Sequence, residues 1–167
     1  MPVFRKWKSI NKFSDAYILA DKMGVGQLFY RPKIKLHGTN AAIQVEDCVM
    51  YVQKRSDFIT VGNDNCGFAA FVDTLELTER VALSSPVIFY GEWAGPGVQK
   101  SDAVCDIPEK TFFVFSVYFV EHDNMAWDTD EIENVVNVFF KDTSRIRVLP
   151  WYREVCDQVD MTRQTIC

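Results

Sequence analysis

The stretch TFFVFSVYFVE, residues 111–121, constrains the fold of this chain more than any other segment. Most of its side chains are aromatic or β-branched, a composition typical of a buried strand. The run is too short to cross a bilayer as a helix, which takes about 20 apolar residues, and no other apolar stretch reaches that length. The sequence therefore predicts a packed sheet with an aromatic core and no membrane span.

Turn signals divide the remaining chain into further elements. We expect strands at 27–36, 41–47, 48–55, 84–93, 111–121 and 144–152, helices at 13–23, 66–83 and 128–141, and a weak helix or tail at 157–167. HGTN would join the first two strands, and an Asp-containing hairpin turn would join the second to the third. Asp128 and the acids after it favour a helix start. This pattern predicts an α+β domain built on antiparallel strands.

Composition excludes several classes of protein. With 167 residues, 48% hydrophobic and 25% charged, the chain is globular and long enough for one domain with a real core. A net charge of −5 argues against a general nucleic-acid coat, although basic residues crowd the first 35 positions and could form a local basic face. Five scattered cysteines without a CxxC indicate reduced thiols, and the N-terminus lacks the apolar core of a signal peptide. We therefore expect a cytoplasmic protein, in the host cell if the chain is viral.

The segment RPKIKLHGTN, residues 31–40, carries the first sign of chemistry. A lysine placed just before a glycine turn, as Lys35 is before Gly38, can meet a phosphate that the loop amides also approach. As a nucleophile Lys35 must lose its proton, and Lys33 on the same strand face could supply the cation that lowers its pKa from about 10.4. Alone, K-x-H-G also fits an edge-strand lysine that discourages aggregation.

Together with three later segments, this motif resembles a known family. KLHGTN resembles the nucleotidyl-transfer motif of the RNA ligase 2 type, within the superfamily of ATP-dependent ligases and capping enzymes. QKRSD resembles the segment whose arginine contacts the nucleotide and the bound end, which would be Arg55. FYGEWAGPGVQK, with its G-x-G-x-Q-K pattern, resembles the third motif, whose glutamate contacts the ribose and would be Glu92. FFVFSVYF resembles the next strand, where an aromatic ring stacks on adenine and would be Phe115.

The resemblance covers about residues 30–120 and implies both a fold and an activity. The fold is an antiparallel-sheet nucleotidyltransferase, the ATP-grasp-like adenylation domain of ligases, truncated at its C-terminus. Residues 1–167 would then form a single, incomplete adenylyltransferase domain. The activity is that of an ATP-dependent RNA ligase: with Mg²⁺, Lys35 attacks the α-phosphate of ATP, and the lysyl-AMP passes AMP to a 5′-phosphate RNA end. A 3′-hydroxyl then joins the strands.

The same resemblance implies a set of site residues. The catalytic residue is Lys35. The nucleotide would be bound by Ile34, Lys35, Leu36, Asn40, Arg55, Glu92 and Phe115. The phosphates or the RNA end would be contacted by Lys33, His37, Gly38, Thr39, Asn40 and Arg55. No metal ligand is identified, although Glu92 is an option.

Two later motifs of that family are missing: an E-G-[VI]-V strand with a metal-serving glutamate, and a K-x-K strand that cradles phosphates. Residues 133–136 and 145–147 are superficially similar, but they follow Phe115 too closely, and the former falls on a predicted helix. The chain is then a truncation, a fragment, a split enzyme completed by a second chain, or a degenerate descendant. The alternative function is a nucleotide- or RNA-end-binding module derived from a ligase. A fold kept only for protein contacts is a third option.

Each site residue also has a simpler interpretation. Glu92 could be a solvated strand end, Phe115 plain core, and Asn40 a turn residue. Arg55 could only pair with Asp57, and His37 could be structural.

Overall fold

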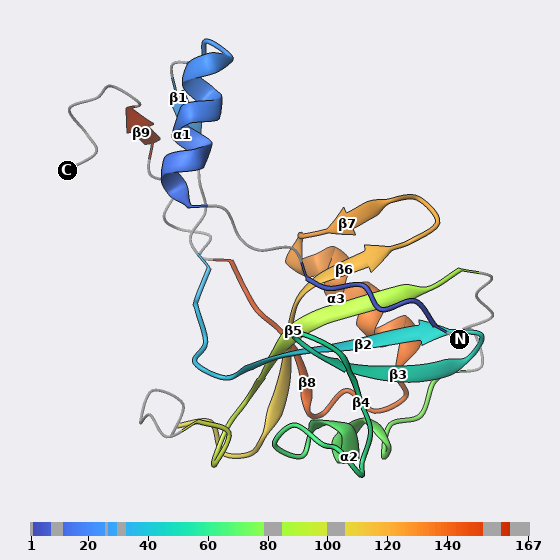
Figure 1. Ribbon diagram of the computed structural model, residues 1–167. Coiled ribbons are helices and arrows are strands. Elements are labelled where there is room, and N and C mark those ends of the chain that lie inside the picture. The colour runs from blue at the N-terminus through green and yellow to red at the C-terminus, as the bar shows by residue number, and fades with distance from the viewer. Residues whose placement is uncertain are drawn as a thin grey trace. The chain divides into compact units, whose positions relative to one another are not determined.

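A computed structural model describes residues 2–7, 12–25, 27–29, 33–78, 85–99, 106–151 and 158–160. The chain divides into a larger unit, residues 1–7 and 35–149, and a smaller unit, residues 8–34 and 150–167 (Figure 1). Among the helices that the structure describes, none has the length and apolarity needed to cross a membrane.

The smaller unit contains α1 (Phe13–Lys22) and a two-stranded sheet of β1 (Gln27–Phe29) and β9 (Gln158–Asp160). The predicted helix at 13–23 is confirmed, and the Asp15 carboxylate closes its start by accepting the Lys12 amide at 3.0 Å. The expected helix or tail at 157–167 is wrong for residues 158–160, which form a strand. The partner of β9 is β1, near the opposite end of the sequence, so no local pattern could reveal it.

The larger unit is built on one sheet with the strand order β4-β3-β2-β5-β6-β7, and β8 pairs with β6. Its strands are β2 (Thr39–Glu46), β3 (Val49–Lys54), β4 (Phe58–Ile59), β5 (Val87–Ala94), β6 (Thr111–Phe119), β7 (Asn124–Ala126) and β8 (Ile146–Val148). Every pairing except β6 with β8 is antiparallel, which confirms the α+β class. Asp47 and Cys48, with φ of 52° and 60°, form the hairpin turn expected between β2 and β3.

Two helices belong to this unit, α2 (Phe68–Val72) and α3 (Thr129–Phe139). The predicted helix at 128–141 is confirmed as α3, whose N-cap Asp128 accepts the amides of the next turn. The predicted helix at 66–83 is confirmed only over α2. Residues 73–78, the last described residues of this stretch, are not helical, so the prediction is wrong there. There the Thr78 amide donates to the Phe139 carbonyl at 2.9 Å, so the backbone is bound to the end of α3 instead of continuing a helix.

The two faces of this sheet differ in what covers them. On the helix-covered face, α2 and α3 pack on a cluster that includes Ile43, Phe89, Trp93 and Phe112, all with 0% exposure. On the opposite face, which we call the site face, residues 2–7 cross one part of the sheet, where Trp7 packs on a smaller cluster. Figure 1 shows this N-terminal trace on one side of the sheet and α3 on the other.

Candidate nucleotide site

Glu92 is the centre of the candidate site. It lies half-buried on β5, directly opposite Asn40 on β2, so both side chains point to the site face. One Glu92 carboxylate oxygen, Oε1, accepts a hydrogen bond from the Gly38 amide at 3.1 Å. A Cβ on Gly38 would come within 2.9 Å of Glu92 Cγ and closer still to the Trp93 carbonyl oxygen. Glycine is therefore the residue that allows the loop to approach β5 this closely.

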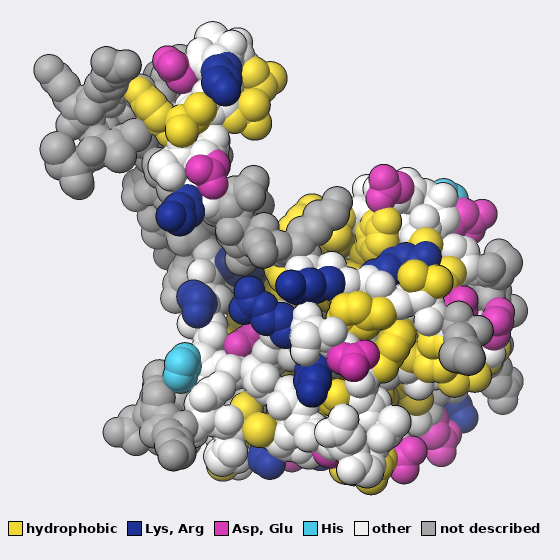
Figure 2. Space-filling model, in the orientation of Figure 1, with side chains coloured by type: hydrophobic (Ala, Val, Ile, Leu, Met, Phe, Trp, Pro, Cys, Tyr) yellow, Lys and Arg dark blue, Asp and Glu magenta, His cyan; other side chains and the backbone are white. Residues whose placement is uncertain are grey.

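Three of the predicted site residues lie near this carboxylate. Burial raises the pKa of Glu92 above its usual 4.5, and this outweighs the Gly38 hydrogen bond and the nearby Lys35, His37 and Arg55, which all lower it. The Lys35, His37 and Arg55 side chains are exposed. Figure 2 shows Lys and Arg side chains gathered over the larger unit, with acidic side chains between them. The fold thus brings Lys35, His37 and Arg55 together around one acid.

Arg55 follows directly after β3 and is available to a ligand. Within the described ranges it forms no ion pair with Asp57, whose carboxylate accepts the Phe58 amide at 2.8 Å. The simpler interpretation of Arg55, as a partner of Asp57, is therefore not what the structure has.

The segment that carries Lys35 differs from the expectation. Residues 34–38 form neither strand nor helix, so the predicted strand at 27–36 is wrong over its last residues. Lys33 and Ile34 belong to the smaller unit, where the Lys33 ammonium lies 4.5 Å from the centre of the Trp151 ring. The prediction that Lys33 and Lys35 share a strand face is therefore also wrong. Leu36 is half-buried next to the exposed Lys35.

Thr39 and Asn40 open β2 beside Gly38. The Thr39 hydroxyl accepts a hydrogen bond from the side-chain amide of Asn65 at 3.0 Å, and this bond connects the start of β2 to the loop before α2. Asn40 is half-buried and stands beside Glu92 in register, so its amide can reach a ligand there. In the part of the chain that the structure describes, no group of three or more His, Cys, Asp or Glu side chains could hold a metal ion.

The strand register adds two residues that sequence reasoning missed. Phe113 on β6 is directly opposite Glu92, and Arg147 on β8 is opposite Phe113. Asn40, Glu92, Phe113 and Arg147 therefore form a row across the site face, with about 4.8 Å between neighbouring strands. Phe115, the predicted stacking ring, lies further along β6 and packs edge-on against Trp7, with ring centres 4.8 Å apart. Only the register distinguishes Phe113 from the other aromatic residues in this run.

Gln99 is a further residue of the site. Its side-chain amide donates to the Gly38 carbonyl at 2.9 Å. The only sequence signal for it was the glutamine of the G-x-G-x-Q-K pattern, to which no role was assigned.

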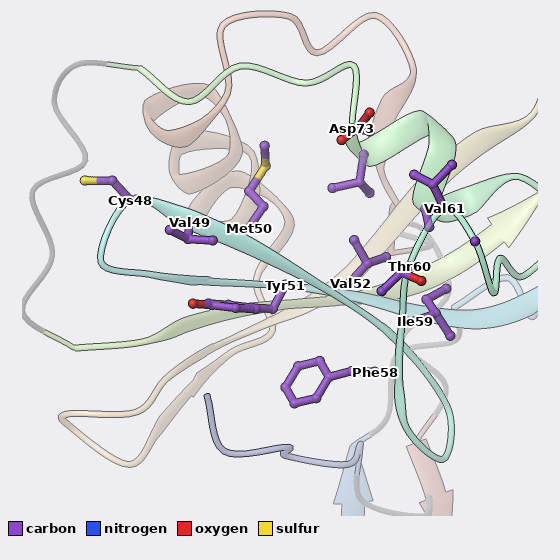
Figure 3. A pocket seen from close by; sticks show the side chains of 13 residues that line it. Cys48, Val49, Met50, Tyr51, Val52, Phe58, Ile59, Thr60, Val61 and Asp73 are labelled. Atoms are coloured by element: carbon purple, nitrogen blue, oxygen red, sulfur yellow. The ribbon is translucent and has the colours of Figure 1, made fainter. Parts of the chain in front are cut away.

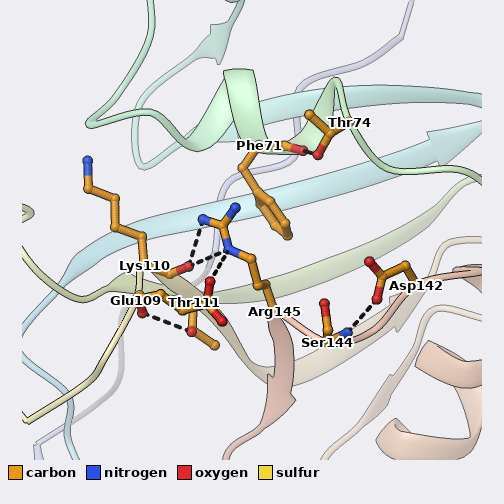
Figure 4. A network of polar contacts seen from close by, with 8 residues as sticks. All are labelled: Phe71, Thr74, Glu109, Lys110, Thr111, Asp142, Ser144 and Arg145. Atoms are coloured by element: carbon orange, nitrogen blue, oxygen red, sulfur yellow. Dashed lines mark hydrogen bonds and ion pairs between the residues drawn. The ribbon is translucent and has the colours of Figure 1, made fainter.

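Arg145 serves the packing of the unit and not the site. Its Nε and Nη2 donate to the Lys110 carbonyl at 2.9 and 2.8 Å, and its guanidinium lies 4.6 Å from the centre of the Phe71 ring on α2 (Figure 4). Arg145 therefore lies against the helix-covered face. Residues 145–147 do not place two cationic side chains on the site face, so they do not provide the K-x-K motif that is missing from the sequence.

An open hollow of about 710 Å³ lies beside β3, β4 and α2 (Figure 3). Its lining is largely apolar, with Met50, Val52 and Val72 among its residues, and it includes none of the predicted site residues. The candidate chemistry therefore belongs to the Glu92 site and not to this hollow.

Comparison with known proteins identifies the family of this chain and supports its fold. The model of the RNA ligase family matches residues 33–161. A mutant of RNA ligase from Naegleria gruberi, solved with AMP and Mn, superposes with a TM-score of 0.61 at 15% identity, and a second mutant, solved with ATP and Mn, does so with a TM-score of 0.61 at 13% identity. In both cases the match covers 97% of this chain and 46% of the other, so this chain spans less than half the length of those ligases.

Proposed function

Because this chain belongs to the RNA ligase family, we propose that it is an ATP-dependent adenylyltransferase that forms lysyl-AMP on Lys35 and passes the AMP to a 5′-phosphate RNA end. The observation that carries the proposal is the cluster of Lys35, His37 and Arg55 around Glu92. Clustered cations suit a polyphosphate, and an acid at their edge suits a ribose hydroxyl. As a further part of the proposal, residues 1–167 act as one adenylyltransferase domain.

The proposed chemistry has three steps. The neutral Lys35 amine attacks the α-phosphorus of ATP, an N–P bond forms, and pyrophosphate leaves with the electrons of the broken P–O bond. An oxygen of the RNA 5′-phosphate then attacks the same phosphorus and releases the lysine. Finally, a 3′-hydroxyl attacks the activated 5′-phosphate and AMP leaves. Arg55 and His37 would stabilise the charge that develops on the phosphate oxygens.

The row across the site face fits the length of a nucleotide. With the ribose on Glu92, the base would lie one strand away over β6 and the α-phosphate one strand away over β2, near Asn40. For the stacking ring, Phe115 remains a prediction, and the register favours Phe113 because it stands directly beside Glu92. Loss of ATP affinity in Phe113→Leu, but not in Phe115→Leu, would decide between them.

ATP is proposed to bind with a divalent cation, as the Naegleria ligases were solved with nucleotide and Mn. The described residues do not fit a metal site made by the protein alone, because no group of three or more His, Cys, Asp or Glu side chains lies there. Mg²⁺ would accompany the phosphates of ATP.

The test is incubation with α-labelled ATP and Mg²⁺ or Mn²⁺, followed by a denaturing gel and intact mass. We expect one AMP per chain in the wild type, none in Lys35→Ala, and the wild-type amount in Lys141→Ala. Lys141 is the matched control because it lies just after α3 and pairs with Glu76. Labelling that survives in Lys35→Ala would refute the assignment of the nucleophile.

The alternative is a nucleotide- or RNA-end-binding module. It gains support from Arg145, which is engaged in packing, and from a chain that spans only 46% of the similar ligases. ATP binding measured by calorimetry without formation of the adduct would favour this alternative. If the chain bound neither ATP nor an RNA end, both functions would be refuted.

A further inference from the structure

We propose that Gln99 is a positioning residue for adenylyl transfer, which holds the Lys35 segment in place through the carbonyl of Gly38. The proposal rests on the proposed function, since it concerns the presentation of Lys35 to ATP. Gly38 is bound from two sides: its amide donates to Glu92 at 3.1 Å, and its carbonyl accepts from Gln99 at 2.9 Å. Together the two side chains fix both polar groups of one peptide residue.

The segment needs such support because regular structure does not provide it. Residues 34–38 form no helix or strand, and β2 begins only at Thr39. Lys35 lies three residues before Gly38, so a shift or rotation at Gly38 carries Lys35 with it. A displacement of about 1 Å at a reacting group is enough to lower a rate roughly 100-fold.

Gln99 is itself held firmly at its backbone. It follows Val98, which is 7% exposed and packs in the core, and the Val98 amide donates to the Gly95 carbonyl at 3.2 Å. The turn after β5 therefore gives the Gln99 side chain a fixed origin. The side chain is exposed, so its replacement removes the hydrogen bond without opening a cavity in the core.

Substitutions of matched size separate positioning from folding. Gln99→Met keeps the length of the side chain and removes the donor, and Gln99→Glu replaces the donor with an oxygen that repels the Gly38 carbonyl. Asn137→Leu is the matched control, because it removes an exposed amide from α3, which packs on the opposite face of the sheet.

Two readouts are measured on the full chain: hydrogen–deuterium exchange of a peptide that covers residues 35–41, and the kinetics of lysyl-AMP formation with ATP and Mg²⁺. In both Gln99 variants we expect faster exchange in this peptide and a rate constant of adduct formation at saturating ATP lowered roughly 10- to 100-fold. The ATP concentration that gives half of this rate should stay within about twofold, and the melting temperature should match the Asn137→Leu control.

An unchanged exchange rate and an unchanged rate constant at saturating ATP in Gln99→Met would overturn the proposal. A raised half-saturating ATP concentration with an unchanged rate constant would overturn it too, because Gln99 would then bind ATP and not position the lysine. If the wild type forms no adduct, the proposed function fails, but the exchange measurement still decides whether Gln99 holds the segment.

Discussion

Gly38→Ala tests whether the approach of the loop to β5 determines the site. A Cβ at this position would meet the Trp93 carbonyl oxygen and Glu92 Cγ at less than 3.0 Å, a separation that real Cβ atoms essentially never show. The Trp93 carbonyl cannot move easily because it belongs to the central strand β5. Something in the loop must therefore give way.

The structure allows two responses, and their costs can be compared. If the loop keeps both of its hydrogen bonds, small backbone shifts must absorb the overpacking, at a cost of about 1–3 kcal/mol. If it moves away, it loses the hydrogen bond to the Glu92 carboxylate, worth about 1.5–3 kcal/mol, and the bond from Gln99, worth about 0.5–1.5 kcal/mol. Keeping the hydrogen bonds is the less costly response, so we expect the free energy of unfolding to fall by about 1–3 kcal/mol. Lysyl-AMP formation should slow at the same time because the small backbone shifts in the loop displace Lys35.

The assay is urea unfolding together with the AMP-labelling rate, with Gly62→Ala as the matched control. A Cβ on Gly62 would meet only the Thr60 hydroxyl oxygen at 3.9 Å, an ordinary contact, so this variant should stay within about 0.5 kcal/mol of the wild type. If Gly38→Ala matched Gly62→Ala in both stability and rate, the steric argument for the loop would be refuted.

Two further predictions concern charge. Because burial raises the pKa of Glu92 in the folded state, the protonated carboxyl favours folding; this contribution is fully present below about pH 4.5 and is lost as the pH rises through the folded pKa. The melting temperature of Glu92→Gln should therefore rise relative to wild type between pH 4 and neutral pH, and a constant difference across this range would contradict the assignment. Arg145→Lys keeps the charge but loses the planar contacts to the Lys110 carbonyl and the Phe71 ring, so urea unfolding should show a loss of about 1–3 kcal/mol. A change below about 0.5 kcal/mol would show that Arg145 is dispensable.

Much of the larger unit follows from local sequence signals. The aromatic run at 111–121 predicted β6, Asp128 predicted the start of α3, and the Asp47 turn predicted the β2–β3 hairpin. These elements depend on neighbours in the chain, which a single sequence displays. The chain after α2 is bound instead at Thr78 to the distant Phe139 carbonyl, a contact that helical spacing in the sequence does not reveal.

The sequence motifs named Lys35, Arg55 and Glu92, and the fold places these three residues near one another. Their geometry was not predictable from the sequence. The face to which each side chain points depends on register, and the β5–β6 register shifts between Tyr90 and Gly91. Phe113 and Phe115 lie two residues apart and both point to the site face, so alternation along β6 does not separate them, and only the pairing of Phe113 with Glu92 does.

The hydrogen bond between Glu92 and Gly38 also has a thermodynamic consequence. One carboxylate oxygen holds the loop, which leaves the other for a ligand on the same face. Ordering of the loop and binding of a ligand to Glu92 are then thermodynamically linked, because each process changes the free energy of the other by the same amount. A ligand that binds Glu92 more tightly when the loop is ordered must favour the ordered loop by the same factor, and a mutation that frees the loop must lower the affinity for that ligand by up to that factor.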